Sequence, residues 1–148
     1  MRIKLRPYHI FAVIRQLATG PTKEDIDRFR GMPIVTEKIK TDPDVEIVLV
    51  KEYDDACVHC AARVPDENGS IWGEGFSCPS SKDQARAEKV TDSMYEILRD
   101  IGLRFGSVMK ARDLLRLAIE KRPSHYEGKS DAYRKQYEDG KIKVAELL

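Results

Sequence analysis

The N-terminal part of the chain changes from one hydrophobic period to another. Ile3 and Leu5 alternate with charged residues, and this period-two pattern predicts a short strand that ends before Pro7. Residues 8–18 have helical spacing instead, so a buried helix is predicted to follow the strand directly. Its apolar face consists of Ile10, Val13, Ile14 and Leu17.

A second, shorter helix is predicted soon after the first. Thr22 is suited to cap this helix, and Asp25, three residues later, stands at the acidic position of a capping box. Gly31 and Pro33 are residue types that stop a helix, so they predict its end.

The middle of the chain is less regular. Residues 34–41 fit neither period clearly, whereas the β-branched run at residues 45–50 predicts a buried strand. Residues 54–81 are rich in glycine, proline and polar side chains and predict a loop. Because a loop of this length is uncommon inside a compact domain, we expect it to have a function.

Helical patterns return after this loop. The apolar residues beyond Ser81 keep helical spacing up to Gly102, where a C-terminal stop is predicted. Ser107 is expected to cap a further helix that ends before Pro123, and the two helices are expected to pair. Residues 130–148 carry many charges and few apolar positions, which predicts a solvated helix along the domain surface.

These elements predict an α+β fold, helix-rich, with a few short strands and a long cysteine-bearing loop. The length of 148 residues suits a single domain that spans residues 1–148. Hydrophobic residues make up 41% of the chain and charged residues 34%, which is typical of a folded globular protein. The 26 Lys and Arg nearly balance the 25 Asp and Glu, so no overall field attracts nucleic acid or a membrane surface.

The sequence also predicts where the protein resides. Residues 1–20 contain His9 and Arg15 within their apolar stretch and have no small-residue cleavage site, unlike a signal peptide. No segment approaches the roughly 20 apolar residues that cross a bilayer. An odd number of cysteines, three, suits a cytosolic metal or thiol site better than a secreted disulfide framework. We therefore expect a soluble, cytoplasmic protein.

The three cysteines form the one constellation with a clear chemical rationale. Cys57 and Cys60 are separated by two residues, and Cys78 follows after seventeen more and precedes Pro79. Two thiolates at this spacing can bind one ion, and a distant third can close the loop around it. Residues 54–81 are therefore predicted to be a metal- or cluster-binding loop. A redox dithiol and incidental buried cysteines are the alternatives.

Three thiolates do not complete a tetrahedral zinc site or a four-cysteine cluster. His9, in the first turn of the N-terminal helix, and His59, between the paired cysteines, are the candidates for a fourth ligand. A fourth position left open for water or substrate is the remaining alternative. The predicted metal ligands are thus Cys57, Cys60, Cys78 and His9.

Three stretches of the chain form motifs: residues 6–11 read Arg-Pro-Tyr-His-Ile-Phe, residues 54–60 read Asp-Asp-Ala-Cys-Val-His-Cys, and residues 98–103 read Leu-Arg-Asp-Ile-Gly-Leu. These motifs resemble those of an uncharacterised prokaryotic family of small iron–sulfur-binding proteins. The family's opening resembles Arg-Pro-His-His-Leu-Leu-Cys, and its later motif resembles Asp-Asp-Ile-Cys with further cysteines. The likeness spans residues 2–120 and implies a bound cluster. It implies no particular activity.

The sequence departs from the family pattern at two positions. Tyr8 replaces the first histidine, and Ala12 stands where the family has its opening cysteine. If that cysteine is a ligand in the family, this chain has lost it. His9 lies one helical turn before Ala12 and is placed to substitute as a ligand or as a hydrogen-bond donor to one.

An iron–sulfur protein is therefore the leading functional prediction. The cluster would lie near the start of the helix that follows Pro7, where the helix dipole and Arg6 favour negative charge. A fully ligated cluster would suit electron transfer to a redox partner or sensing, whereas an open iron would suit a small-molecule substrate. The sequence itself assigns no enzymatic activity, since it lacks a nucleophile elbow, a phosphate loop and a two-histidine metal motif.

The alternative is a structural zinc module that binds a partner protein or RNA. Trp72 and Phe76, with Arg63, would offer a stacking surface on the metal loop. Nucleic acid is the less favoured partner because the same loop carries acidic residues that repel phosphate, namely Asp66, Glu67 and Glu74. Tyr137, in the C-terminal segment, is interpreted as a packing residue of a helix face.

Overall fold

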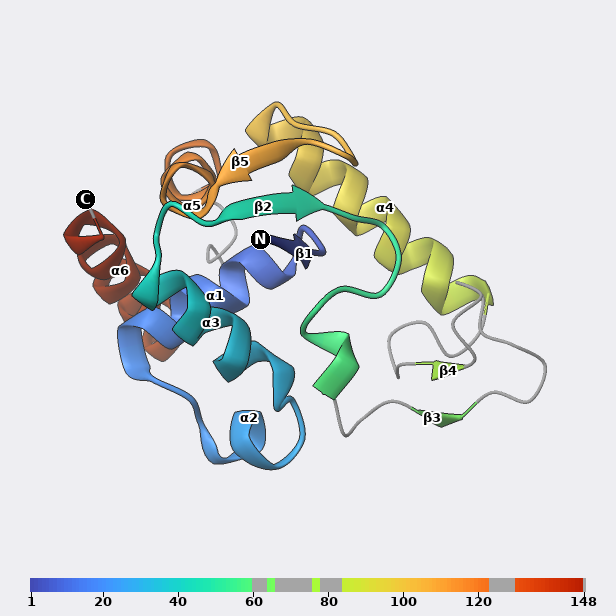
Figure 1. The fold of residues 1–148 in the computed structure, drawn as a ribbon, viewed down its shortest axis with the longest axis horizontal. Coiled ribbons are helices and arrows are strands. Elements are labelled where there is room, and N and C mark those ends of the chain that lie inside the picture. Colours follow the sequence, from blue (N-terminus) through green and yellow to red (C-terminus); the bar gives the residue numbers. More distant parts are fainter. Residues whose placement is uncertain (60–63, 66–75, 78–83, 123–129, 148) are drawn as a thin grey trace.

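The α+β fold predicted from the sequence is confirmed by a computed structural model, which describes residues 1–59, 64–65, 76–77, 84–122 and 130–147. Helices dominate the described chain and surround a small sheet (Figure 1). Among the described residues, no helix is both long and apolar enough to cross a membrane.

The sheet joins three segments that lie far apart in the sequence. Its strands are β1 (Arg2–Leu5), β2 (Glu46–Leu49) and β5 (Val108–Lys110), in the order β1-β2-β5. β1 runs parallel to β2, with Ile3 opposite Ile47, and β5 pairs antiparallel to β2, with Met109 opposite Ile47. The period-two pattern therefore has its expected result, because the apolar residues of β1 and β2 alternate into the core.

The helices fall largely where the spacing of apolar residues predicts them. The helices described are α1 (His9–Thr19), α2 (Lys23–Asp27), α3 (Gly31–Thr41), α4 (Gln84–Ile101), α5 (Ala111–Lys121) and α6 (Asp131–Glu146). Helix α1 packs against α3, α5 and α6. The predicted capping box is confirmed at α2, where the Thr22 N–H donates to Asp25 Oδ2 (2.8 Å) and the Asp25 N–H to Thr22 Oγ1 (3.2 Å).

Two predicted boundaries are wrong. Gly31 and Pro33 begin helix α3 instead of ending α2, because proline is tolerated in the first turn, where its missing N–H has no intrahelical partner. Ser107 does not cap α5, since strand β5 intervenes and the residue before the helix is Lys110. The Ser107 Oγ instead accepts a hydrogen bond from the Arg104 N–H (3.1 Å) within a turn.

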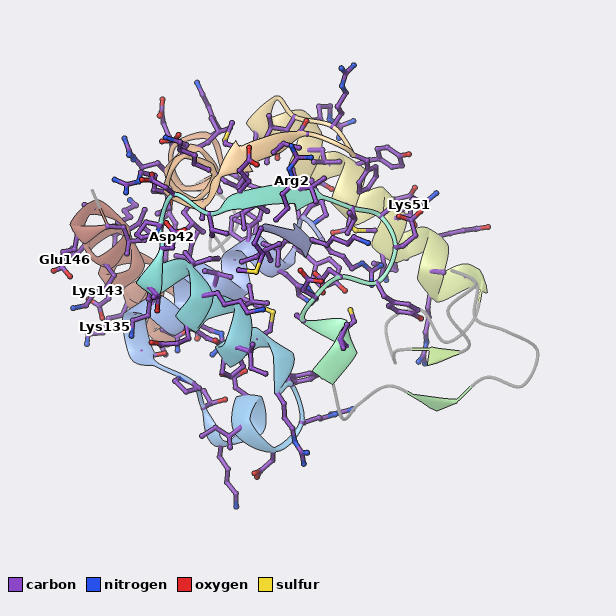
Figure 2. All side chains as sticks on the ribbon, in the orientation of Figure 1. Arg2, Asp42, Lys51, Lys135, Lys143 and Glu146 are labelled. Carbon is purple, nitrogen blue, oxygen red and sulfur yellow. The ribbon has the colours of Figure 1, made fainter. Side chains whose placement is uncertain are left out.

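The C-terminal helix α6 is more than a solvated surface helix. Its inner face buries Tyr137, Gly140 and Val144, and its contact with α1 is the most extensive between two helices. Figure 2 shows Lys135, Lys143 and Glu146 projecting from the opposite side of α6. Tyr137 is confirmed as a packing residue, with its hydroxyl donating to the Ile119 carbonyl oxygen (2.8 Å). A helix of low mean hydropathy thus contributes a narrow but buried stripe.

Only parts of the predicted loop at residues 54–81 are described. They are residues 54–56, a single 3₁₀ turn, η1 (Cys57–His59), and two short antiparallel strands, β3 (Val64–Pro65) and β4 (Phe76–Ser77). The turn η1 follows β2 and returns the chain toward the start of α3 (Figure 1). This path places the first predicted ligand, Cys57, beside the sheet and the N-terminal helices.

Candidate functional site

A single buried carboxylate, that of Asp54, organises the region around Cys57. Its Oδ2 accepts hydrogen bonds from the Arg6 N–H (2.7 Å) and from His9 Nδ1 (2.5 Å). Its Oδ1 accepts from the N–H of Ala56 (3.0 Å), the N–H of Cys57 (3.2 Å) and the Cys57 thiol (3.3 Å). Asp54 therefore connects the start of α1 to the turn that carries Cys57.

The local sequence explains why this connection forms. An aspartate side chain readily bonds backbone N–H groups two and three residues later, as Asp54 does with Ala56 and Cys57. On the other side, β1 ends at Leu5 and α1 begins at His9, and the Arg6 N–H between these two elements donates to Asp54. The N-terminal end of a helix carries partial positive charge, which stabilises a nearby carboxylate.

The neighbouring residue, Asp55, fastens the same segment to the outer edge of the sheet. The Asp55 N–H donates to the Lys4 carbonyl oxygen (3.1 Å), and the Lys4 N–H donates to Asp55 Oδ2 (2.8 Å). This pair of bonds continues the hydrogen bonding of β1 on the side opposite β2. The two adjacent aspartates thus have different tasks, since Asp55 binds the strand whereas Asp54 binds His9 and Cys57.

The start of helix α3 packs directly against the backbone of the segment that carries Cys57. A Cβ placed on Gly31 would lie 1.8 Å from the carbonyl oxygen of Ala56. Only glycine permits so close an approach between the start of α3 and the backbone next to Cys57. The position of Cys57 is consequently fixed by β1, α1 and α3 together.

A buried cation lies in the same region. Arg6 is fully buried, with its guanidinium carbon 5.1 Å from the centroid of the Tyr8 ring and 5.8 Å from that of Tyr53. Both distances are within the range of cation–π attraction. The positive charge of Arg6 also acts on the thiol of Cys57, where it favours the thiolate.

The charges in the site shift two ionisation equilibria in opposite directions. Burial alone would raise the pKa of Asp54, but the charge of His9 and the hydrogen bonds from His9, Arg6 and Cys57 outweigh it and lower the pKa below 3.8. Burial raises the pKa of the Cys57 thiol far above its usual range, and the charge of Asp54 raises it further. Without a metal ion, Cys57 is therefore a protonated thiol that donates to an ionised Asp54.

The ionised carboxylate also determines which nitrogen of His9 carries a proton. A carboxylate can only accept, so the contact with Asp54 Oδ2 requires a proton on Nδ1. Nε2 is then the nitrogen that can bind a metal ion or accept a proton. The His9 side chain retains 17% of its exposure, and its ring packs edge-on against Tyr8 at a centroid distance of 4.4 Å.

The structure brings together two of the predicted metal ligands, His9 and Cys57, through their shared partner Asp54. Cys60 and Cys78 lie outside the described residues, as does the side chain of His59. Within the described part of the chain, no group of three His, Cys, Asp or Glu side chains could hold a metal ion. There, His9 and Cys57 are joined by their hydrogen bonds to the carboxylate of Asp54.

Ala12, at the position of the family's opening cysteine, lies in α1 and packs half-buried against the core. It offers no ligand. Sequence reasoning assigned no role to Asp54, although its place three residues before Cys57 was an available signal for an aspartate turn. That Asp54 also reaches His9, 45 residues away in sequence, depends on the packing of α1 against the segment after β2.

The donor types in this region are compatible with a thiolate-bound metal or cluster. Cys57 provides sulfur, and His9 has Nδ1 held by a carboxylate, the arrangement usual for a metal-binding histidine. Arg6 and the N-terminus of α1 supply positive charge where an anionic cluster would need it. Metal binding would have to displace the thiol proton that Cys57 donates to Asp54.

Comparison with known proteins adds no relative. No family model matches the chain, and no curated protein or solved structure is significantly similar to it.

Proposed function

We propose that the protein binds a metal centre through Cys57, Cys60 and Cys78, with His9 as a further ligand. An iron–sulfur cluster is the favoured centre, and a zinc ion is the alternative. The observation that carries the proposal is the shared contact of His9 and Cys57 with Asp54. The sequence predicted Cys57 as a ligand from the cysteine spacing and His9 from its residue type and from the resemblance, and their distance in the chain gave no reason for them to lie together.

Two positive groups near the site, Arg6 and the N-terminal end of α1, support a cluster, and one negative group, the ionised Asp54, opposes further negative charge there. A cluster bound by thiolates carries net negative charge, which buried Arg6 and the positive end of α1 would offset. A bound iron–sulfur cluster would supply one-electron chemistry. Membership of the iron–sulfur family that the sequence resembles is part of this proposal, as is a cytoplasmic location, where such thiols stay reduced.

Purification without oxygen tests the proposal. The protein would be isolated under nitrogen, and its visible spectrum would be recorded together with assays for iron, acid-labile sulfide and zinc. Brown protein with absorbance near roughly 400 nm and matching iron and sulfide supports a cluster. Colourless protein with one zinc per chain supports the structural zinc alternative instead. Protein free of all three refutes metal binding.

Single substitutions then identify the ligands. Cys57→Ser, Cys60→Ser and Cys78→Ser should each lose most of the bound metal. Val58→Ser is the matched control, because Val58 lies in the same turn, is 54% exposed and has no metal-binding group. If Cys78→Ser retains full metal content, Cys78 does not belong to the site.

A further inference from the structure

The Asp54 side chain contacts both described ligand candidates, His9 through Oδ2 and Cys57 through Oδ1. Five donors converge on its carboxylate, three from the backbone and two from the side chains of His9 and Cys57. Its side chain has no exposure to solvent. A carboxylate so fully occupied by donors is poorly suited to bind a metal directly, but it can orient the groups around it.

We propose that Asp54 is the positioning residue of the site, holding Nδ1 of His9 so that Nε2 is the atom that binds the metal. This inference rests on the proposed function and extends it by naming the ligating nitrogen and the residue that selects it. Asp54 also holds the Cys57 backbone through the Cys57 N–H. The ligands would thus be arranged before the metal arrives.

This arrangement has a direct energetic consequence. A free histidine side chain rotates and exchanges between two neutral tautomers, so binding a metal must first select one rotamer and one tautomer. The bond to Asp54 makes this selection in the folded protein. Loss of a carboxylate that orients a metal-binding histidine costs about 10–100-fold in metal affinity.

The substitution Asp54→Asn tests the role, with Asp55→Asn as a matched control. Each aspartate side chain accepts one backbone hydrogen bond from this part of the chain. Asp54 accepts from the Arg6 N–H, and Asp55 accepts from the Lys4 N–H. Only Asp54 reaches His9 and Cys57. A general weakening of the segment would affect both variants, whereas loss of positioning would affect Asp54→Asn alone.

The first readout needs no metal. Nitrogen-15 NMR of the histidine rings in the chelator-treated full chain should show a protonated Nδ1 for His9 in the wild type and in Asp55→Asn. In Asp54→Asn the proton should shift toward Nε2. A wild-type His9 that carries its proton on Nε2 with Nδ1 bare overturns the proposal without any variant, so the test does not depend on Asp54→Asn folding.

The second readout is binding of Co²⁺ alone, followed by its sulfur-to-metal charge-transfer absorbance. Asp54→Asn should weaken Co²⁺ binding about 10–100-fold, while Asp55→Asn should stay within about threefold of the wild type. Unchanged affinity in Asp54→Asn overturns the role of Asp54 and leaves metal binding intact. A wild type that binds neither Co²⁺ nor any native metal overturns the proposed function, and with it the ligand role of Nε2.

Discussion

Replacing Gly31 with alanine tests whether the turn that carries Cys57 is fixed by the start of helix α3. The added methyl group would lie 1.8 Å from the carbonyl oxygen of Ala56 and 2.5 Å from its carbonyl carbon. Both atoms belong to the backbone, so no side-chain rotation relieves the overlap. Either α3 or the segment at Ala56 must move by more than about 1 Å before the contact reaches the 3.0 Å limit.

The expected cost follows from the size of this overlap. Overpacking a well-filled site destabilises proteins by about 1–3 kcal/mol, and a backbone contact belongs at the upper end of that range. The better helix propensity of alanine recovers at most about 1 kcal/mol. We expect Gly31→Ala to lower the free energy of unfolding by about 2 kcal/mol, which corresponds to a fall in Tm of about 4–8 °C.

The measurement is chemical denaturation of the wild type and the variant, combined with an assay of metal content. Gly140→Ala is the matched control, because its methyl group would lie 2.6 Å from Cγ2 of Ile14 and 3.2 Å from the Ile14 carbonyl oxygen, at the contact between α6 and α1 and not at the Cys57 segment. This control should lose about 1 kcal/mol of stability and keep its metal. Gly31→Ala should lose stability and metal together, since Cys57 follows Ala56 directly.

One result would refute the reasoning. If Gly31→Ala is as stable as the wild type and binds metal equally well, the segment at Ala56 is free to move, and α3 does not position Cys57.

Three further predictions concern single interactions. The pKa of Asp54 is lower in the folded protein than in the unfolded chain, so ionised Asp54 stabilises the folded protein fully above about pH 5, and this stabilisation is lost as pH falls through the folded-state pKa. When the free energy of unfolding is measured by denaturation from pH 7 to pH 3, Asp54→Asn should lose less of it on acidification than the wild type does. Thr22→Ala removes the cap of α2 and should cost about 1 kcal/mol in the same denaturation assay, whereas Thr22→Ser should restore most of it. Tyr137→Phe should cost about 1 kcal/mol by loss of its bond to the Ile119 carbonyl; no change in thermal unfolding would show that this bond adds no net stability.

Local sequence determined much of the secondary structure. The alternation of Ile3 and Leu5 predicted β1, and the spacing of apolar residues predicted α1, α4 and the body of α5. The capping box at Thr22 was also readable, because its donors and acceptors lie within one helical turn. These features depend on neighbours in the chain, so a single sequence contains the information.

The errors occurred where local signals had two meanings. Gly31 is a helix-stopping residue type, yet here it begins α3, because the close approach of Ala56 requires a residue without a side chain. Ser107 is a good capping residue, but pairing with β2 draws the residues after it into strand β5. In both cases a contact with a distant part of the chain decided the outcome.

The candidate site shows the same division. Cysteine spacing selected Cys57, Cys60 and Cys78, and residue type together with the family resemblance proposed His9 as a further ligand. Only the tertiary structure showed that His9 and Cys57 share the carboxylate of Asp54 and that Arg6 is buried beside them. These residues lie far apart in the sequence, and they meet because β1 pairs with β2 and α1 packs against the segment that follows β2. Hydrogen bonds between distant segments depend on that packing, which no local pattern specifies.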